Sequence, residues 1–162
     1  MNARVLGVDP GTAITGYGVV EAVAGRPGRL LECGVLRTNP RTPLALRLKV
    51  LHDGVRDVIA RHAPTVVAVE GVFYGRNVRS TVTLSHARAA ILLAAAEAGL
   101  PVTEYAPAVV KRAVTGTGRA GKRQVGLMVQ QLLRLTAAPR PADAADGVAL
   151  ALAHLLRNGR PR

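Results

Sequence analysis

The sequence predicts an α/β protein in which helices cover a mixed β-sheet. Near the N-terminus, apolar strands follow one another with only turn signals between them, whereas later apolar strands are separated by segments of helical periodicity. Strands joined by a tight turn pair antiparallel, and strands joined through a helix can pair parallel, so one sheet should contain both kinds of pairing. A length of 162 residues suits one domain with a single hydrophobic core.

Three strands are predicted first. Residues 4–9 are apolar and end at Asp9, directly before a Pro-Gly turn signal. Residues 16–22 and 29–38 follow, and the glycines and proline at 25–28 have the chemistry of a hairpin tip. The opening of the chain is therefore predicted as a three-stranded unit.

The middle of the chain alternates between helix and strand. In residues 43–61, apolar positions recur at steps of three and four, which marks one face of an amphipathic helix. A short apolar strand at 65–69 ends at Glu70, and a loop follows at 71–79. The helix predicted at 80–99 is apolar on more than one face, so we expect the core to cover one side and a second subunit the other.

The remaining elements are one strand and three helices. They are predicted at residues 102–105, 108–114, 122–135 and 143–156. We expect a single domain over residues 1–157 and a basic flexible tail at 158–162. If the helix at 80–99 joins two subunits, a charge placed at Ile91 or Leu92 should weaken dimerisation.

Composition excludes several classes of protein. The chain has 22 basic and 10 acidic residues, a net charge of +12, which is typical of proteins that bind polyanions. Charge alone leaves nucleic acid, acidic lipid and the ribosome open as partners. A lone cysteine, Cys33, rules out an intramolecular disulfide and a cysteine-based zinc site. The longest apolar run is far shorter than the roughly 20 residues of a membrane span, so we expect a cytoplasmic protein without membrane contact.

Four carboxylates differ from the other acidic residues because they lie at the ends of predicted elements. Asp9 and Glu70 end two strands that we expect to be parallel neighbours, and ligands gather at such strand ends. Asp143 and Asp146 begin the last helix on one face. The other six lie within predicted elements and are expected to be surface charges: Glu21, Glu32, Asp53, Asp57, Glu97 and Glu104.

Each of the four also has a simpler explanation. Asp9 can shape the following turn, Glu70 can be a solvated strand end, and the helix dipole favours acids in a first turn. Their shared position at element ends favours convergence on one site. Converging carboxylates repel one another, and hard divalent cations relieve that repulsion. Because paired cations can clamp a phosphoryl group in an in-line displacement, acids converging in a basic chain indicate a nuclease.

A basic stretch lies between the predicted acids. Residues 105–142 contain seven lysines and arginines and no acidic residue, and Arg76 and Arg79 add positive charge from the loop after Glu70. Charge runs are more often solvated surfaces. Here the complete lack of acids beside the proposed site favours contact with phosphates.

At these residues the sequence resembles the RuvC family of Holliday junction resolvases, within the ribonuclease H-like superfamily. The resemblance extends from about residue 5 to residue 154. The matching stretches are residues 7–12, 15–20, 67–73, 104–105, 110–111, 116–124 and 141–146.

The resemblance implies a ribonuclease H-like mixed five-stranded sheet flanked by helices. It also implies a homodimer that binds four-way DNA junctions and nicks two opposed strands symmetrically during recombination and repair. Mg²⁺ or Mn²⁺, two ions per active site, would be the cofactor, and RuvA and RuvB would be partners.

The resemblance also implies roles for single residues. The catalytic, metal-binding carboxylates would be Asp9, Glu70, Asp143 and Asp146, and Lys111 and Lys122 would be catalytic residues near the scissile phosphate. The implied DNA-binding residues are Phe73, Tyr74, Arg76, Arg79, Lys111, Arg112, Arg119, Lys122 and Arg123. The chain departs from the family at Gly71, where glutamine is usual, and at Gly147, where alanine is common. From these two glycines we expect a looser loop and a less rigid final helix.

Three other functions remain open from the residues. The Asp-Pro-Gly-Thr motif at 9–12 also fits the phosphate loop of actin-like ATPases and sugar kinases, but those enzymes need two lobes and leave Asp143 and Asp146 unexplained. A ribonuclease H-like enzyme could act on RNA or an RNA–DNA hybrid. A non-catalytic module could bind junctions through its basic residues alone.

Overall fold

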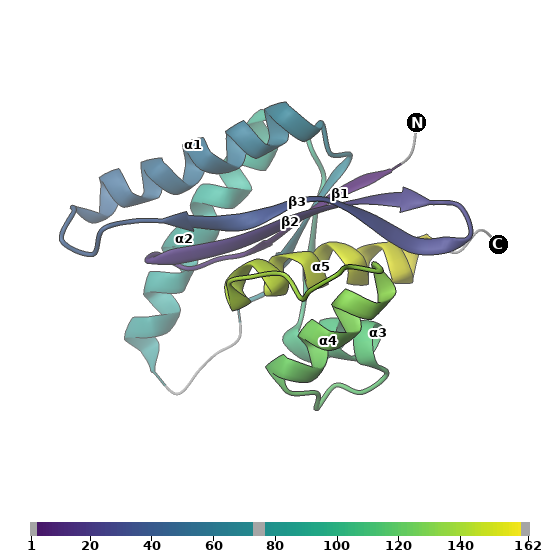
Figure 1. Ribbon diagram of the computed structural model, residues 1–162. Helices are drawn as coiled ribbons and strands as arrows, with labels where there is room; N and C mark the ends of the chain where they lie inside the picture. Colours follow the sequence, from purple (N-terminus) through teal and green to yellow (C-terminus); the bar gives the residue numbers. More distant parts are fainter. Residues whose placement is uncertain (1–2, 73–76, 160–162) are drawn as a thin grey trace.

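The computed structural model describes residues 3–72 and 77–159 and contains a five-stranded sheet between two layers of helices (Figure 1). The strand order is β3-β2-β1-β4-β5. β1 pairs antiparallel with β2 and parallel with β4, so the predicted mixed sheet is confirmed. The strands are β1 (Arg4–Asp9), β2 (Ile14–Val23), β3 (Arg26–Arg37), β4 (Val66–Glu70) and β5 (Val102–Tyr105).

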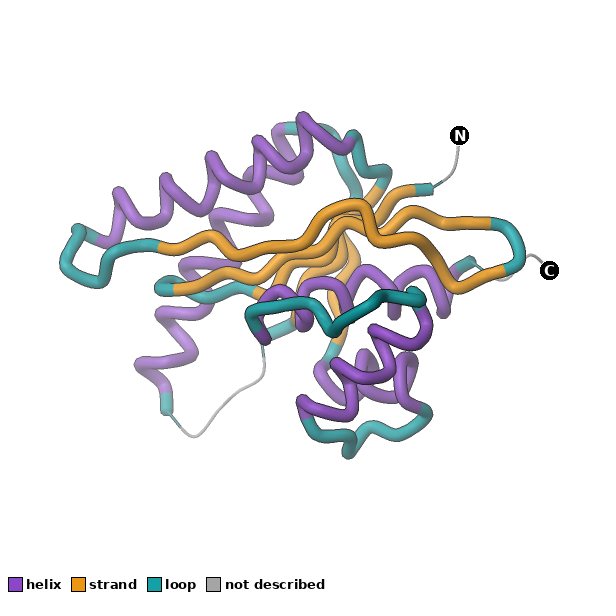
Figure 2. The backbone as a smooth tube through the Cα atoms, in the orientation of Figure 1, coloured by secondary structure: helices purple, strands orange, loops and turns teal. Residues whose placement is uncertain are grey.

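Helices cover both faces of this sheet (Figure 2). α1 and α2 pack on the face that carries Leu6 and Val8, and α3, α4 and α5 pack on the face that carries Val5. The alternation of side chains along β1 thus fills two core layers. The helices are α1 (Leu44–His62), α2 (Val78–Glu97), α3 (Pro107–Thr115), α4 (Lys122–Leu132) and α5 (Ala142–Asn158).

The hairpin between β2 and β3 differs from the sequence prediction. Its turn is the two-residue Ala24-Gly25, since Val23 already pairs with Arg26. Gly25 has a φ of 75°, which glycine adopts without strain. Pro27 is tolerated inside β3 because β3 is an edge strand.

Glu21 is not a surface charge, contrary to the sequence prediction. It is only 5% exposed. Its two carboxylate oxygens accept hydrogen bonds from Arg4, at 3.0 Å, and from Arg29, at 2.6 Å. Burial of this charge is tolerated because both oxygens have a cationic partner.

The side of α2 that points away from the core carries exposed apolar side chains among polar ones. Ile91 is fully buried within the protein's own core, whereas Leu93 is 55% exposed. Exposed apolar side chains also occur on α1, at Leu46 and Val50. Ile91 is therefore the wrong position at which to test dimerisation, because a charge there would disrupt the core itself. None of the helices in the described ranges has the length and apolar character needed to cross a membrane.

α5 lies directly on the backbone of β1 and β2 because glycines remove the side chains between them. A Cβ at Gly16 would lie 1.7 Å from the carbonyl oxygen of Asp143, and a Cβ at Gly7 would lie 2.1 Å from that of Gly147. On the helix side, a Cβ at Gly147 would meet the Cα of Tyr17 at 2.5 Å. Gly147, from which a less rigid helix was expected, instead permits close packing of the helix on the sheet.

Candidate active site at the ends of β1 and β4

Two carboxylates of the site come from adjacent parallel strands. The register pairs Val8 of β1 with Val69 of β4, so Asp9 and Glu70 follow side by side at the carboxyl ends of the strands. The turn after Asp9 is held by Thr15, which is fully buried. The Thr15 hydroxyl donates to the carbonyl of Gly11 at 2.7 Å and accepts from its N–H at 3.1 Å.

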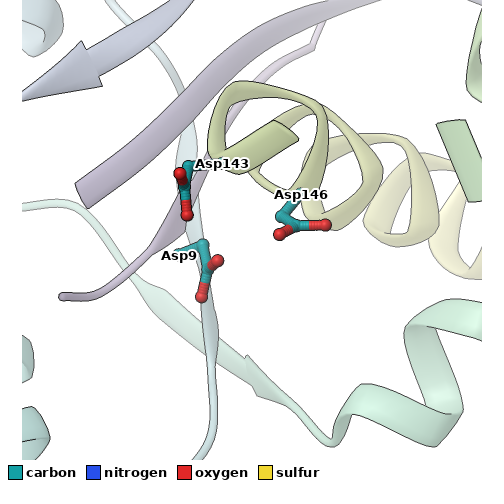
Figure 3. Close-up of side chains that lie close together, drawn as sticks. All are labelled: Asp9, Asp143 and Asp146. Atoms are coloured by element: carbon teal, nitrogen blue, oxygen red, sulfur yellow. The ribbon is translucent and has the colours of Figure 1, made fainter. Parts of the chain in front are cut away.

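The first turn of α5 brings two more carboxylates to the same place. Oxygens of Asp9, Asp143 and Asp146 all lie within 4.8 Å of one another (Figure 3). Glu70 interacts with Asp9, and these two residues and Asp146 line one cleft, the acidic cleft, whose volume is about 230 Å³. The cleft is lined by Asp9, Glu70, Pro107, Val110, Lys111, Lys122, Val125, Asp146, Ala149 and Leu150.

The cluster carries more negative charge than its surroundings neutralise. Burial raises the pKa of Asp9, and the neighbouring carboxylates of Glu70, Asp146 and Asp143 raise it further. Burial also raises the pKa of Asp146, although the Nζ of Lys122 lies 3.5 Å from its Oδ2 and opposes that effect. Asp146 in turn raises the pKa of Lys122. Oxygen ligands with surplus negative charge are the donor set that a hard divalent cation prefers, so these residues fit such an ion.

Comparison with known proteins assigns the chain that carries this site to a family. The family described as crossover junction endodeoxyribonuclease RuvC matches residues 5–154. The chain belongs to the RuvC family. It is 51% identical over 150 residues to the crossover junction endodeoxyribonuclease RuvC of Pelotomaculum thermopropionicum, covering 93% of this chain and 91% of that one. It is 50% identical over 158 residues to the RuvC of Halorhodospira halophila, covering 98% and 93% of the two chains.

Solved structures agree with this assignment. RuvC of Thermus thermophilus in complex with a Holliday junction substrate is 42% identical, with a TM-score of 0.90 over 96% of this chain and 94% of that one. The yeast mitochondrial Holliday junction resolvase Ydc2 shares the fold, with a TM-score of 0.65 at 13% identity, over 95% and 79% of the chains. The chain thus has the fold of the RuvC crossover junction endodeoxyribonucleases, and the resemblance to that family seen in the sequence is confirmed.

The basic residues expected from the RuvC resemblance lie in different places around the cluster. Lys111 of α3 and Lys122, the first residue of α4, both line the acidic cleft. Arg79 lies in the first turn of α2 and lines a separate cleft with Gly11 and Thr12.

Other members of the predicted set do not line the acidic cleft or lie beyond the described ranges. Arg112 lines a different cleft from the acidic one, and Arg119 and Arg123 are exposed. Within residues 3–72 and 77–159, none of these three arginines forms an ion pair. Phe73, Tyr74 and Arg76 lie outside the described residues.

The glycines that position α5 were missed in the sequence. Gly16 and Gly18 alternate along β2, and so point to the same face of the sheet. A glycine inside a strand often marks a close approach by another backbone. The two glycines on one face of β2 could therefore have predicted that a helix packs closely there. Gly71, by contrast, has room for a side chain, since a Cβ there meets its nearest neighbour, the carbonyl oxygen of Tyr105, only at 3.6 Å.

Proposed function

We propose that this RuvC family member resolves four-way DNA junctions by nicking two opposed strands symmetrically, with Asp9, Glu70, Asp143 and Asp146 as its metal-binding carboxylates. The observation that carries the proposal is the convergence of acidic oxygens from β1 and α5 in a chain of net charge +12. A polyanionic substrate is attracted by the protein as a whole, and carboxylates concentrate at one point within it. That combination suits metal-dependent hydrolysis of a phosphodiester.

The four carboxylates would hold two Mg²⁺ or Mn²⁺ ions. When bound, such ions supply Lewis-acid stabilisation of phosphate oxygens and a water of lowered pKa. Asp9 interacts with each of the other three carboxylates, so it would hold the ions together with them. The ammonium of Lys122 lies 3.5 Å from Asp146 and has further N–H groups that would bind a phosphate oxygen, and Lys111 would add positive charge from the lining of the same cleft.

The expected partners rest on other parts of the surface. Arg79, Arg112, Arg119 and Arg123 would contact DNA phosphates, together with Phe73, Tyr74 and Arg76 from the loop after Glu70. The RuvC of Thermus thermophilus that binds a Holliday junction supports DNA junctions as the substrate. The exposed apolar side chains of α1 and α2 support a homodimer. RuvA and RuvB would be partners in the cytoplasm.

The test compares substrates and one isosteric variant. Four-way junction, linear duplex and RNA–DNA hybrid are incubated with and without Mg²⁺ or Mn²⁺ and resolved on a denaturing gel. We expect paired nicks in the junction only, and only with metal. Asp9→Asn should lower nicking by several orders of magnitude, because metal stabilisation supplies several kcal/mol.

Binding measured on the same preparations separates chemistry from affinity. Asp9→Asn can only lower the negative charge facing the DNA, so junction affinity in metal-free buffer at low salt should hold or improve. Near wild-type nicking by Asp9→Asn would show that the acidic cluster is not the active site. Preferential cleavage of the hybrid would instead favour an RNA-directed nuclease.

A further inference from the structure

Three arginines meet in a second cleft, away from the acidic cluster. Arg26 comes from the β2–β3 hairpin, Arg112 from α3 and Arg157 from the last turn of α5. We call it the arginine cleft; it is open, has a volume of about 400 Å³, and is also lined by Pro27, Ala113, Leu155, Leu156 and Gly159. Figure 2 shows the hairpin turn and the end of α5 at the same end of the molecule.

The positive charge of the arginine cleft is not neutralised by the part of the protein that the structure describes. All three arginines are exposed, and none forms an ion pair with a described carboxylate. The carboxylate of the hairpin, Glu21, is already bound by two other arginines. The sequence contains no acidic residue in 105–142 and none after Asp146.

Helix dipoles explain only part of this arrangement. Arg112 and Arg157 lie in the last turns of α3 and α5, where the negative end of the helix favours a cation. Arg26 belongs to a hairpin, so no helix dipole favours a cation at its position. Three guanidinium groups around one open cleft form a fork-like donor set that matches phosphate oxygens.

The arginine cleft and the acidic cleft share two helices. On α3, Lys111 lines the acidic cleft and the next residue, Arg112, lines the arginine cleft. On α5, Asp146 lines the acidic cleft and Arg157 lines the arginine cleft. Eleven residues of helix separate positions 146 and 157, roughly 16 Å at the helical rise of about 1.5 Å per residue. Duplex DNA advances about 3.4 Å per base pair, so this length corresponds to about five base pairs.

We propose that the arginine cleft binds the phosphate backbone of a duplex arm of the junction, about five base pairs from the nicked phosphate. The proposal rests on the function proposed above. The contact is to the DNA backbone and is therefore independent of base sequence. It fixes the direction in which the duplex arm leaves the active site.

The test is a salt titration of DNA binding. Wild type, the double variant Arg26→Ala/Arg157→Ala and the control Arg56→Ala are titrated with labelled junction by fluorescence anisotropy in metal-free buffer. Arg56 is an exposed arginine of α1, on the opposite face of the sheet. The double variant should raise the Kd roughly tenfold and make the slope of log K against log salt shallower by about 2, one for each lost phosphate contact. Arg56→Ala should leave both unchanged.

Neutral methylphosphonate linkages locate the contact on the DNA. Placed about five nucleotides from the nick, they should weaken binding by wild type but not by the double variant, since the contact is already lost. Placed at the far end of the arm, they should affect neither protein.

The possible results separate the explanations. A double variant with lower thermal stability but wild-type Kd and salt slope would assign the arginines to the helix dipoles and overturn the proposal. Loss of binding to anionic lipid vesicles with unchanged DNA binding would also overturn it, in favour of a membrane surface. Failure of the proposed function is recognised separately, because wild type itself would then not nick the junction.

Discussion

The carboxylate of Asp146 in the acidic cleft has more than one possible cationic partner. Asp146 interacts with Lys122 at 3.5 Å, and it also lies beside two other aspartates whose negative charge Lys122 does not balance. A cation held by these carboxylates would therefore compete with Lys122 for the oxygens of Asp146. Changes at single residues should shift that competition in measurable ways.

Removing the charge of Lys122 should separate catalysis from metal binding. We expect Lys122→Gln to lower the single-turnover rate of junction nicking about 100-fold, because the cation proposed to lie near the scissile phosphate is lost. The metal concentration that gives half-maximal nicking should fall at the same time, since Asp146 no longer has a competing cation. Lys49→Gln, an exposed lysine on α1, is the control. An unchanged rate in Lys122→Gln would remove this lysine from the catalytic groups.

The cluster should also link metal to stability. A ligand that binds only the folded state at 100 times its Kd adds about 2.7 kcal/mol to the free energy of unfolding. We expect Mn²⁺ to raise the Tm of wild type in thermal unfolding and to raise that of Asp143→Asn much less. Equal shifts in both proteins would place the stabilising ion elsewhere.

At the scale of elements, the site depends on how closely α5 approaches the sheet. Asp143 and Asp146 reach Asp9 because glycines at the contact allow helix backbone to lie on strand backbone. The same contact fixes the direction in which the first turn of α5 points. Packing between two elements thus determines the geometry of the acidic side chains. A methyl group placed at the contact should therefore change the positions of Asp143 and Asp146 relative to Asp9.

Gly16→Ala tests that dependence. Its Cβ would lie 1.7 Å from the carbonyl oxygen of Asp143, so the helix must move. We expect a loss of about 1–3 kcal/mol in the free energy of unfolding and a loss of nicking beyond what the lower stability explains. Gly126→Ala on α4 is the control, since a Cβ there meets nothing within 4 Å and should stabilise the helix slightly. Wild-type nicking by a folded Gly16→Ala would contradict the packing argument.

A second contact between elements makes stability depend on pH. Glu32 of β3 accepts hydrogen bonds from Tyr17 at 2.7 Å and Arg61 at 2.6 Å, and bonds His62 at 2.6 Å. Burial acts to raise the pKa of Glu32, but these partners outweigh it and lower that pKa from 4.5 to about 2. The folded state therefore favours the ionised form, and its stabilisation is complete above pH 4.5 and is lost as pH falls towards 2.

Glu32→Gln should accordingly flatten the pH dependence. We expect the free energy of unfolding by urea to fall less between pH 4.5 and 2 in the variant than in wild type. Asp57→Asn, on the exposed surface of α1, should retain the wild-type slope. A wild-type slope in Glu32→Gln would mean that other carboxylates carry the acid sensitivity.

At the scale of the whole molecule, local patterns predicted the elements, and contacts distant in sequence determined what was missed. Turn signals and apolar periodicity placed all five strands and five helices, and strand ends placed Asp9 and Glu70. Glu21 was misassigned because its partners Arg4 and Arg29 meet it only when β1, β2 and β3 are side by side. The role of Gly147 was hidden for the same reason, since Tyr17 is 130 positions away in the sequence.

Association of two copies should depend on the exposed apolar face of α2. We expect Leu93→Glu to convert dimer to monomer in sedimentation experiments and to abolish paired nicking, because two sites related by a two-fold axis are needed to cut opposed strands. Leu127→Glu on α4 is the matched control, since Leu127 is 52% exposed and Leu93 55%. A Leu93→Glu protein that still sediments as a dimer would place the interface on another surface.

The four carboxylates come from segments of the chain that are translated at different times. Asp9 and Glu70 are translated early, but Asp143 and Asp146 belong to the last helix. At roughly 5–20 residues per second, several seconds separate Glu70 from Asp143 on the ribosome. A nascent chain that ends before Asp143 therefore contains only two of the four carboxylates proposed to bind the metal ions. If these carboxylates are the metal ligands proposed above, nuclease activity begins only after α5 has docked on the sheet.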